Sequence, residues 1–111
     1  MLERLLRLDG VVAAVHFREG GGLLNGVGQL SGEQMELVAR FANDHKRITQ
    51  SNGDQFSVLA QMNGWAPARG WIVHGPRMSA VGMADIACVF RNGAAKYNEL
   101  LEEMRQTLTT L

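Results

Sequence analysis

Apolar residues in the first third of the chain predict a short helix followed by two strands. Helical spacing near the N-terminus predicts a two-turn amphipathic helix, carried by Leu2, Leu5 and Leu6. Residues 11–17 are apolar on both alternating faces, with Val11, Ala13, Val15 and Phe17 expected on one and Val12 and Ala14 on the other. This pattern is typical of a strand in a sheet that is covered on both sides. Three glycines at 20–22 then predict a hairpin turn into a return strand that starts at Leu23.

The start of the next element carries the strongest local signal in the chain. Ser31 and Gln34 have the spacing of a capping box, in which each side chain bonds the other residue's backbone N–H. Leu30 and Met35 flank the box as a hydrophobic staple. The predicted apolar stripe of this helix consists of Met35, Val38, Phe41, Ala42 and Ile48, with His45 on the same side.

Where this central helix ends is ambiguous from the sequence. Asn52-Gly53 is typical of a break, and residues 55–62 also fit a strand. Helical spacing nevertheless continues through Phe56, Leu59 and Met62, so we favour one long helix from 32 to 62 that is kinked near Gly53. At ~1.5 Å per residue such a helix is about 46 Å long, and its end should overhang the domain and need a second chain to cover it.

The last third of the chain predicts three strands and a helix. The strands are expected at 71–74, 78–83 and 86–91, and Asn92 is expected to cap the final helix. That helix has an apolar stripe made of Tyr97, Leu101, Met104 and Leu108. The expected fold class is therefore α+β, in the order α-β-β-α-β-β-β-α. We expect a single domain over 1–111, with a five-stranded antiparallel sheet, the terminal helices on one face and the central helix on the other.

This order resembles the roadblock (dynein light chain) family, whose fold is profilin-like. The resemblance covers nearly the whole chain: residues 5–14, the hairpin ending in Gly22-Leu23-Leu24, the capped central helix and the three-strand run into the last helix. The chain is also similar to an uncharacterised bacterial branch, associated with sulfur- and metal-oxidising bacteria. The residues of that likeness are Met62, Asn63, Trp65, Pro67, Arg69, Gly70 and Trp71.

The resemblance implies a homodimeric, cofactor-free interaction protein. Roadblock proteins bind or regulate small GTPases or scaffold larger complexes, and they offer no catalytic residues to transfer. In their dimers the strand that corresponds to residues 69–75 lies at a sheet edge and pairs with its copy, while the central helices pack over the joined sheet. Trp71 and Val73 would then share one face near the two-fold axis.

Composition removes several other functions. Apolar residues make up 46% of the 111, which is enough for a core without metal or disulfides, and Lys plus Arg equals Asp plus Glu at 11 each. Nucleic-acid binders usually carry an excess of basic residues, so we expect no nucleic-acid binding by this chain. The N-terminus lacks the long apolar run of a signal peptide, no stretch is long enough to span a membrane, and a lone cysteine fits a reducing cytoplasm.

Candidate chemical groups are few and scattered. Cys88 alternates with apolar Ile86 and Phe90, which predicts a buried structural thiol; a reactive, sulfur-carrying thiol is the alternative. His16, His45 and His74 lack the spacing of a helical metal site. The glycines near 20–28 lack the lysine of a phosphate-binding loop, and no serine lies in a nucleophile elbow.

The tryptophans support two interpretations. Trp65 and Trp71 lie close together in sequence, either as core residues or as a contact patch strengthened by Arg69. The leading hypothesis is a non-enzymatic homodimer with a dimer or partner interface formed by Phe56, Leu59, Met62, Trp65, Arg69, Trp71 and Val73. The alternatives are a small-ligand sensor or carrier, with a pocket between sheet and central helix, and a sulfur carrier through Cys88.

Overall fold

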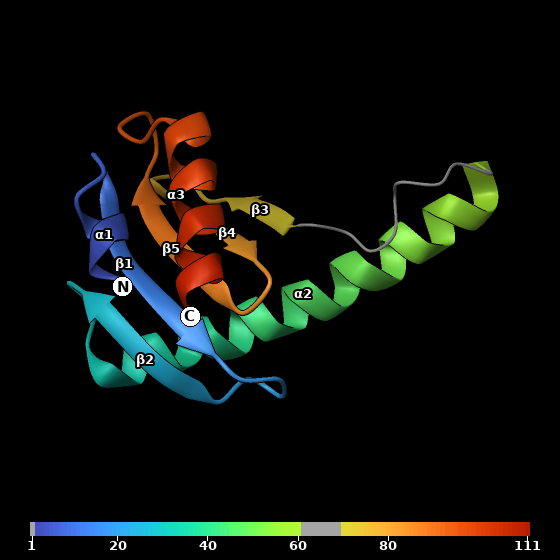
Figure 1. The fold of residues 1–111 in the computed structure, drawn as a ribbon, viewed down its shortest axis with the longest axis horizontal. Coiled ribbons are helices and arrows are strands. Elements are labelled where there is room, and N and C mark those ends of the chain that lie inside the picture. Colours follow the sequence, from blue (N-terminus) through green and yellow to red (C-terminus); the bar gives the residue numbers. More distant parts are fainter. Residues whose placement is uncertain (1, 61–69) are drawn as a thin grey trace.

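A computed structural model describes residues 2–60 and 70–111, with side chains of the central helix described as far as Ser51. The elements have the predicted order (Figure 1). They are α1 Glu3–Leu6, β1 Val11–Phe17, β2 Leu23–Gly28, α2 Gly32–Ala60, β3 Gly70–His74, β4 Met78–Met83, β5 Ile86–Arg91 and α3 Tyr97–Thr110.

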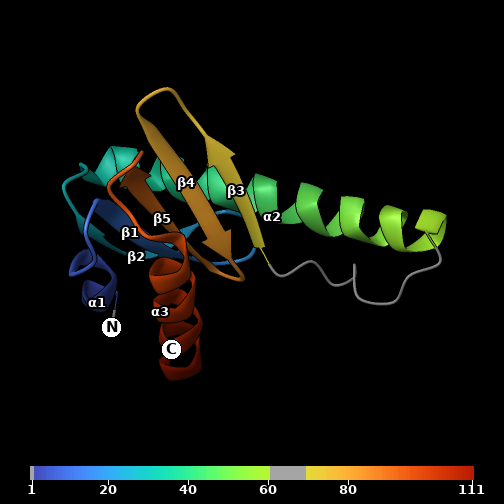
Figure 2. The ribbon, with the colours of Figure 1, turned by 90° about the horizontal axis from the view of Figure 1, so that it is seen from above.

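The strands form one antiparallel sheet in the order β2-β1-β5-β4-β3. Helices α1 and α3 cover one face and α2 crosses the other, as expected (Figure 2). Strands β2 and β3 are the two edges of the sheet. The edge position of β3 confirms the expectation for residues 69–75 where the structure describes them.

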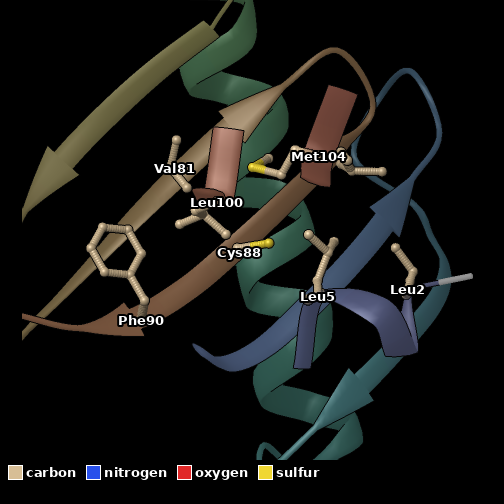
Figure 3. Close-up of a cluster of buried hydrophobic side chains, with 9 residues drawn as sticks. Leu2, Leu5, Val81, Cys88, Phe90, Leu100 and Met104 are labelled. Carbon is tan, nitrogen blue, oxygen red and sulfur yellow. The ribbon is translucent and has the colours of Figure 1, made fainter. Parts of the chain in front are cut away.

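Each face of the sheet has its own buried cluster. Between the sheet and the terminal helices lie apolar side chains from α1 and the residue before it, and from β4, β5 and α3. Figure 3 labels Leu2, Leu5, Val81, Cys88, Phe90, Leu100 and Met104. Between the sheet and α2 lie Val15, Phe17, Met35, Ala39, Ala42, Trp71 and Ala87. The doubly apolar pattern of β1 therefore predicted its double burial correctly.

The register of β1 differs from simple alternation at one end. Its pairing with β5 shifts between Val11 and Ala13. Because of this shift, Val11 packs against the cluster under the terminal helices, whereas Val15 and Phe17 face α2. The expectation that Val11 shares a face with those residues was wrong, because a bulge re-aims the side chain next to it.

Helix α2 begins at the predicted cap. Gln34 N donates to Ser31 Oγ at 3.1 Å, and Ser31 N donates to Gln34 Oε1 at 2.9 Å. Leu30 and Met35 pack in the same apolar cluster. The capping box and the staple are both confirmed.

Helix α2 continues through Asn52-Gly53 without a break, so the predicted long helix is confirmed as far as Ala60 and the strand alternative is wrong. Its 29 residues span about 44 Å at ~1.5 Å per residue. Figure 1 shows the C-terminal half of the helix projecting beyond the sheet. Met62 lies outside the described residues.

Two expectations at the other helices were wrong. The first helix is a single turn, Glu3–Leu6. Asn92 does not cap α3, which starts at Tyr97 after Lys96, a residue without a capping side-chain bond. Instead, the Asn92 amide donates to Gly75 O at 2.8 Å and ties the β3–β4 turn to the segment after β5. No helix in the described ranges is long and apolar enough to cross a membrane.

Candidate interaction surface

The backbone of edge strand β3 has hydrogen-bonding groups that face away from the sheet. Gly75 N donates to Met78 O at 2.9 Å and closes the β3–β4 hairpin. Hydrogen-bonded pairs alternate along an antiparallel ladder, so Trp71 and Val73 bond to β4. The N–H and C=O groups of Gly70, Ile72 and His74 therefore point to the open edge.

The side chains of β3 divide between the two faces. Trp71 is 9% exposed and Val73 is half-buried, and both pack in the cluster under α2. Ile72 points to the opposite face and is 43% exposed, although its strand neighbours are buried or half-buried. This edge thus presents an apolar, β-branched residue at its centre.

Trp71 fastens the edge strand to α2. Its ring centroid lies 5.8 Å from that of Phe41 and 5.2 Å from that of His45. The indole also lies directly against Gly82, where any Cβ atom would collide with it. Its buried Nε1 has no hydrogen-bond acceptor among the described residues. For Trp71, the interpretation as a core residue is therefore correct.

The outer side of α2 carries a second apolar stripe, which is exposed and which no element of the described part of the chain covers. Leu37, Phe41 and Ile48 are 61%, 38% and 55% exposed. They follow each other at intervals of four and seven residues, which places them on one side of a helix. The sequence pattern assigned Phe41 and Ile48 to the core, but the sheet-facing positions are Ala39 and Ala42. Small side chains let the helix lie close to the sheet and leave the large ones outside.

The opposite edge of the sheet, strand β2, has features that disfavour pairing with a further strand. By the same alternation, Gly26 of β2 directs its N–H outward. The Asn25 side chain accepts that N–H at 2.9 Å. Gly28 has φ +118°, which departs from extended backbone. An incoming strand would therefore meet a satisfied donor and a bent backbone at β2, but neither on the described strand β3.

The structure places two of the predicted interface residues together and leaves five outside its described side chains. Trp71 and Val73 lie side by side under α2. Phe56 and Leu59 lie on α2 beyond its last described side chain, whereas Met62, Trp65 and Arg69 lie outside the described residues. Sequence reasoning missed Ile72 and Leu37. Alternation along β3 could have identified Ile72, because its side chain points to the opposite face of the sheet from those of Trp71 and Val73.

The titratable groups of the described side chains do not converge on a reactive centre. Burial raises the pKa of the Cys88 thiol from its ordinary value of 9.0 to about 12, so the thiol stays protonated near neutral pH. His45 Nδ1 lies 2.9 Å from Phe41 O, and His74 Nδ1 lies 3.1 Å from Ser79 Oγ. Within the described ranges, no three His, Cys, Asp or Glu side chains are grouped for a metal ion.

A hollow of about 570 Å³ lies along α2. Its lining among the described residues comes from the helix alone: Asp44, Arg47, Ile48 and Ser51. Since none of these residues belongs to the sheet, this hollow is not the pocket between sheet and helix that the small-ligand alternative requires.

Comparisons with known proteins agree with this architecture. A protein family described as "Uncharacterized conserved protein (DUF2173)" matches residues 1–106, and no curated protein matches the chain in sequence. A Roadblock/LC7 domain from Streptomyces avermitilis has a TM-score of 0.75 at 16% identity, covering 97% of this chain and 94% of that chain. The gliding protein MglB from Thermus thermophilus has a TM-score of 0.73 at 18% identity, covering 95% and 78%.

Myxococcus xanthus MglB has a TM-score of 0.67 at 13% identity, covering 97% of this chain and 91% of that one. At these identities the likeness shows the fold alone. The roadblock-like fold expected from the sequence is thus confirmed.

Proposed function

Because the chain belongs to the DUF2173 family of uncharacterised conserved proteins and has a roadblock fold, we propose that it is a non-enzymatic, homodimeric protein-interaction module. The observation that carries this proposal is the contrast between the two sheet edges. In β2 the Asn25 side chain accepts the outward N–H of Gly26, whereas β3 presents outward backbone groups around an exposed Ile72. An open, apolar edge strand recruits another strand.

The outward groups of β3 specify how two copies pair. Only Gly70, Ile72 and His74 offer an N–H and a C=O to the edge, and the register that overlaps all five residues of β3 places Ile72 opposite its copy. In that register Ile72 packs on Ile72 of the second copy on one face, and Trp71 packs beside Val73 of the second copy on the other. Gly70, without a side chain, leaves room opposite His74.

The same pairing covers the exposed stripe of α2. Phe41 contacts Trp71, so the stripe lies on the side of α2 next to β3. A second copy joined at β3 brings its own α2 to this side, where Leu37, Phe41 and Ile48 find an apolar partner. By sequence spacing Leu59 follows Ile48 by three helical turns, so the proposed interface includes it together with Phe56, Met62, Trp65 and Arg69.

The proposed module has one roadblock-like domain over 1–111, acts in the cytoplasm of a bacterium and uses no cofactor. A small GTPase or a metabolic complex is the partner that the roadblock resemblance suggests. The buried, protonated state of Cys88 argues against the sulfur-carrier alternative.

Sedimentation equilibrium at micromolar concentration tests the homodimer. Wild type should sediment as a dimer. Ile72→Asp places two like charges at the two-fold axis and Val73→Asp places two near it, so both variants should sediment as monomers. Ile72→Asp is the cleaner variant, since Ile72 is exposed in the protomer and its replacement leaves the core intact. Leu24→Asp introduces the same charge at an exposed position of the other edge and should remain a dimer. A monomeric wild type would refute the proposal.

A further inference from the structure

The face of the sheet that carries α1 and α3 has an exposed aromatic pair next to edge strand β3. His74 and Tyr97 meet edge to face, with ring centroids 6.1 Å apart. The Tyr97 ring also packs edge-on against buried Phe90 at 5.5 Å. Both rings of the His74–Tyr97 pair are nonetheless exposed. The pair therefore has a fixed base and an open outer side.

A hydrogen-bond network that includes the buried Ser79 holds the histidine ring in place. Asn92 Nδ2 donates to Gly75 O, which leaves Asn92 Oδ1 to accept the single proton of Ser79 Oγ. Ser79 Oγ lies 3.1 Å from His74 Nδ1, and Tyr97 Oη lies 3.4 Å from the same nitrogen. Two side chains therefore hold the ring through Nδ1. Ser79 is buried, so His74 is held from inside the protein.

This rigidity contributes to binding more than to folding. The His74 ring is exposed, so its fixed orientation adds little to the stability of the protomer. A binding surface made of pre-ordered aromatic side chains loses less conformational entropy when a ligand arrives. The His74–Tyr97 pair has this property, and Ile72 lies two residues before His74 on the same face of β3.

The charges around the pair have one sign. Arg77 and Lys96 are exposed and have no ion pair among the described residues. The Arg77 carbonyl accepts from Asn92 N at 3.0 Å, and Lys96 directly precedes Tyr97. From residue 70 to residue 84 the chain has no Asp or Glu. Glu99 follows Tyr97 by two residues, about 200° around the axis of α3.

We propose that the surface formed by His74, Arg77, Lys96 and Tyr97 binds a short acidic segment of a partner protein that carries an apolar side chain among its carboxylates. The apolar side chain packs against Tyr97, and carboxylates face Arg77 and Lys96. Charge complementarity selects this partner over a basic or neutral one, and an aromatic ring flanked by cations is typical of an interface hot spot. The proposal rests on the interaction-module function but needs only one protomer.

Selection from a displayed random library of peptides about twelve residues long, with the full-length chain as bait, tests this surface. Selected peptides should combine Asp or Glu with an apolar residue. Their amide chemical-shift changes on ¹⁵N-labelled protein should centre on residues 72–78 and 92–97. Arg77→Glu and Tyr97→Ala should each weaken binding by about tenfold or more. Arg7→Glu, the same charge change at an exposed residue directly after α1, should leave it unchanged.

Several results would contradict the proposal. No enriched peptides, enriched peptides without acidic residues, shift changes on α2, or equal losses for Arg7→Glu and Arg77→Glu would each overturn the proposal. Equal binding of polyglutamate would also overturn it, since that result reduces the surface to non-specific charge. Sedimentation of the same samples separates this outcome from the homodimer, because Arg77→Glu should change peptide affinity without changing oligomeric state.

Discussion

The pKa of the Cys88 thiol is set by the apolar side chains that surround it. It lies between β5 and the terminal helices, among Leu5, Phe90 and Met104 (Figure 3). Desolvation there raises its pKa to about 12, so the folded protein retains a proton that the unfolded chain releases above pH 9. The stabilising contribution is therefore complete below pH 9 and is lost as pH rises towards 12.

A comparison of wild type with Cys88→Ala isolates this contribution. At pH 7 the substitution should lower the free energy of unfolding by about 1 kcal/mol, because it leaves a small cavity. Between pH 9 and 12 the wild type should lose about 1.4 kcal/mol per pH unit relative to the variant. Urea denaturation at pH 7 and pH 10 measures the difference. A difference that is independent of pH would contradict the buried, protonated thiol.

Gly82 makes room for the indole of Trp71 on the neighbouring strand. A Cβ atom at this position would collide with Trp71 Cε2, Cζ2 and Nε1. Gly82→Ala should therefore lower the free energy of unfolding by about 1–3 kcal/mol and loosen β3 from α2. Gly32→Ala, where nothing lies within 4 Å of the added methyl group, is the matched control and should be near neutral. Thermal unfolding with tryptophan fluorescence as the probe compares the two.

At the scale of elements, the sequence predicted the structure correctly where a single local interaction determines it. Ser31 and Gln34 bond each other's backbone within the first turn, so their spacing in the sequence was enough to predict the start of α2. The continuation through Gly53 also followed from helical spacing, because the cost of one glycine in a helix, about 1 kcal/mol, is small beside that of a new boundary.

Predictions from local sequence patterns were wrong where groups from distant parts of the chain compete to bond or pack against the same residue. Asn92 has a good cap sequence, but Gly75 O and Ser79 offer it partners that come from the β3–β4 hairpin. Likewise, α2 has apolar residues on more than one side, and hydrophobic periodicity cannot say which side meets the sheet. Close packing on Ala39 and Ala42 decides the matter and leaves Phe41 outside. The candidate interface consequently gained Leu37 and Ile72 only from the structure.

The capping box gives a quantitative test at this scale. Ser31→Ala removes the acceptor of Gln34 N and should lower the free energy of unfolding by about 0.5–2 kcal/mol. Gln50→Ala, a substitution within the same helix at an exposed position, should change it by less than about 0.5 kcal/mol. An unchanged denaturation midpoint for Ser31→Ala would mean that the cap contributes nothing to stability.

At the scale of the whole molecule, the distribution of apolar surface is asymmetric. Both faces of the sheet are covered, yet apolar side chains remain exposed on α2 and at the centre of β3. Figure 1 shows half of α2 extending past the sheet, beyond any element of its own chain. The proposed second copy joined at β3 would cover the open edge, the outward stripe and the overhanging helix together.

Cross-linking at the two edges tests this account most directly. Because Cys88 is buried, a cysteine introduced at Ile72 or at Leu24 supplies the accessible thiol. Treatment with a short bis-maleimide, followed by denaturing electrophoresis, should convert Ile72→Cys to covalent dimer and leave Leu24→Cys as monomer. Dimer from Leu24→Cys in equal or greater yield, or monomer from both variants, would contradict self-association through β3.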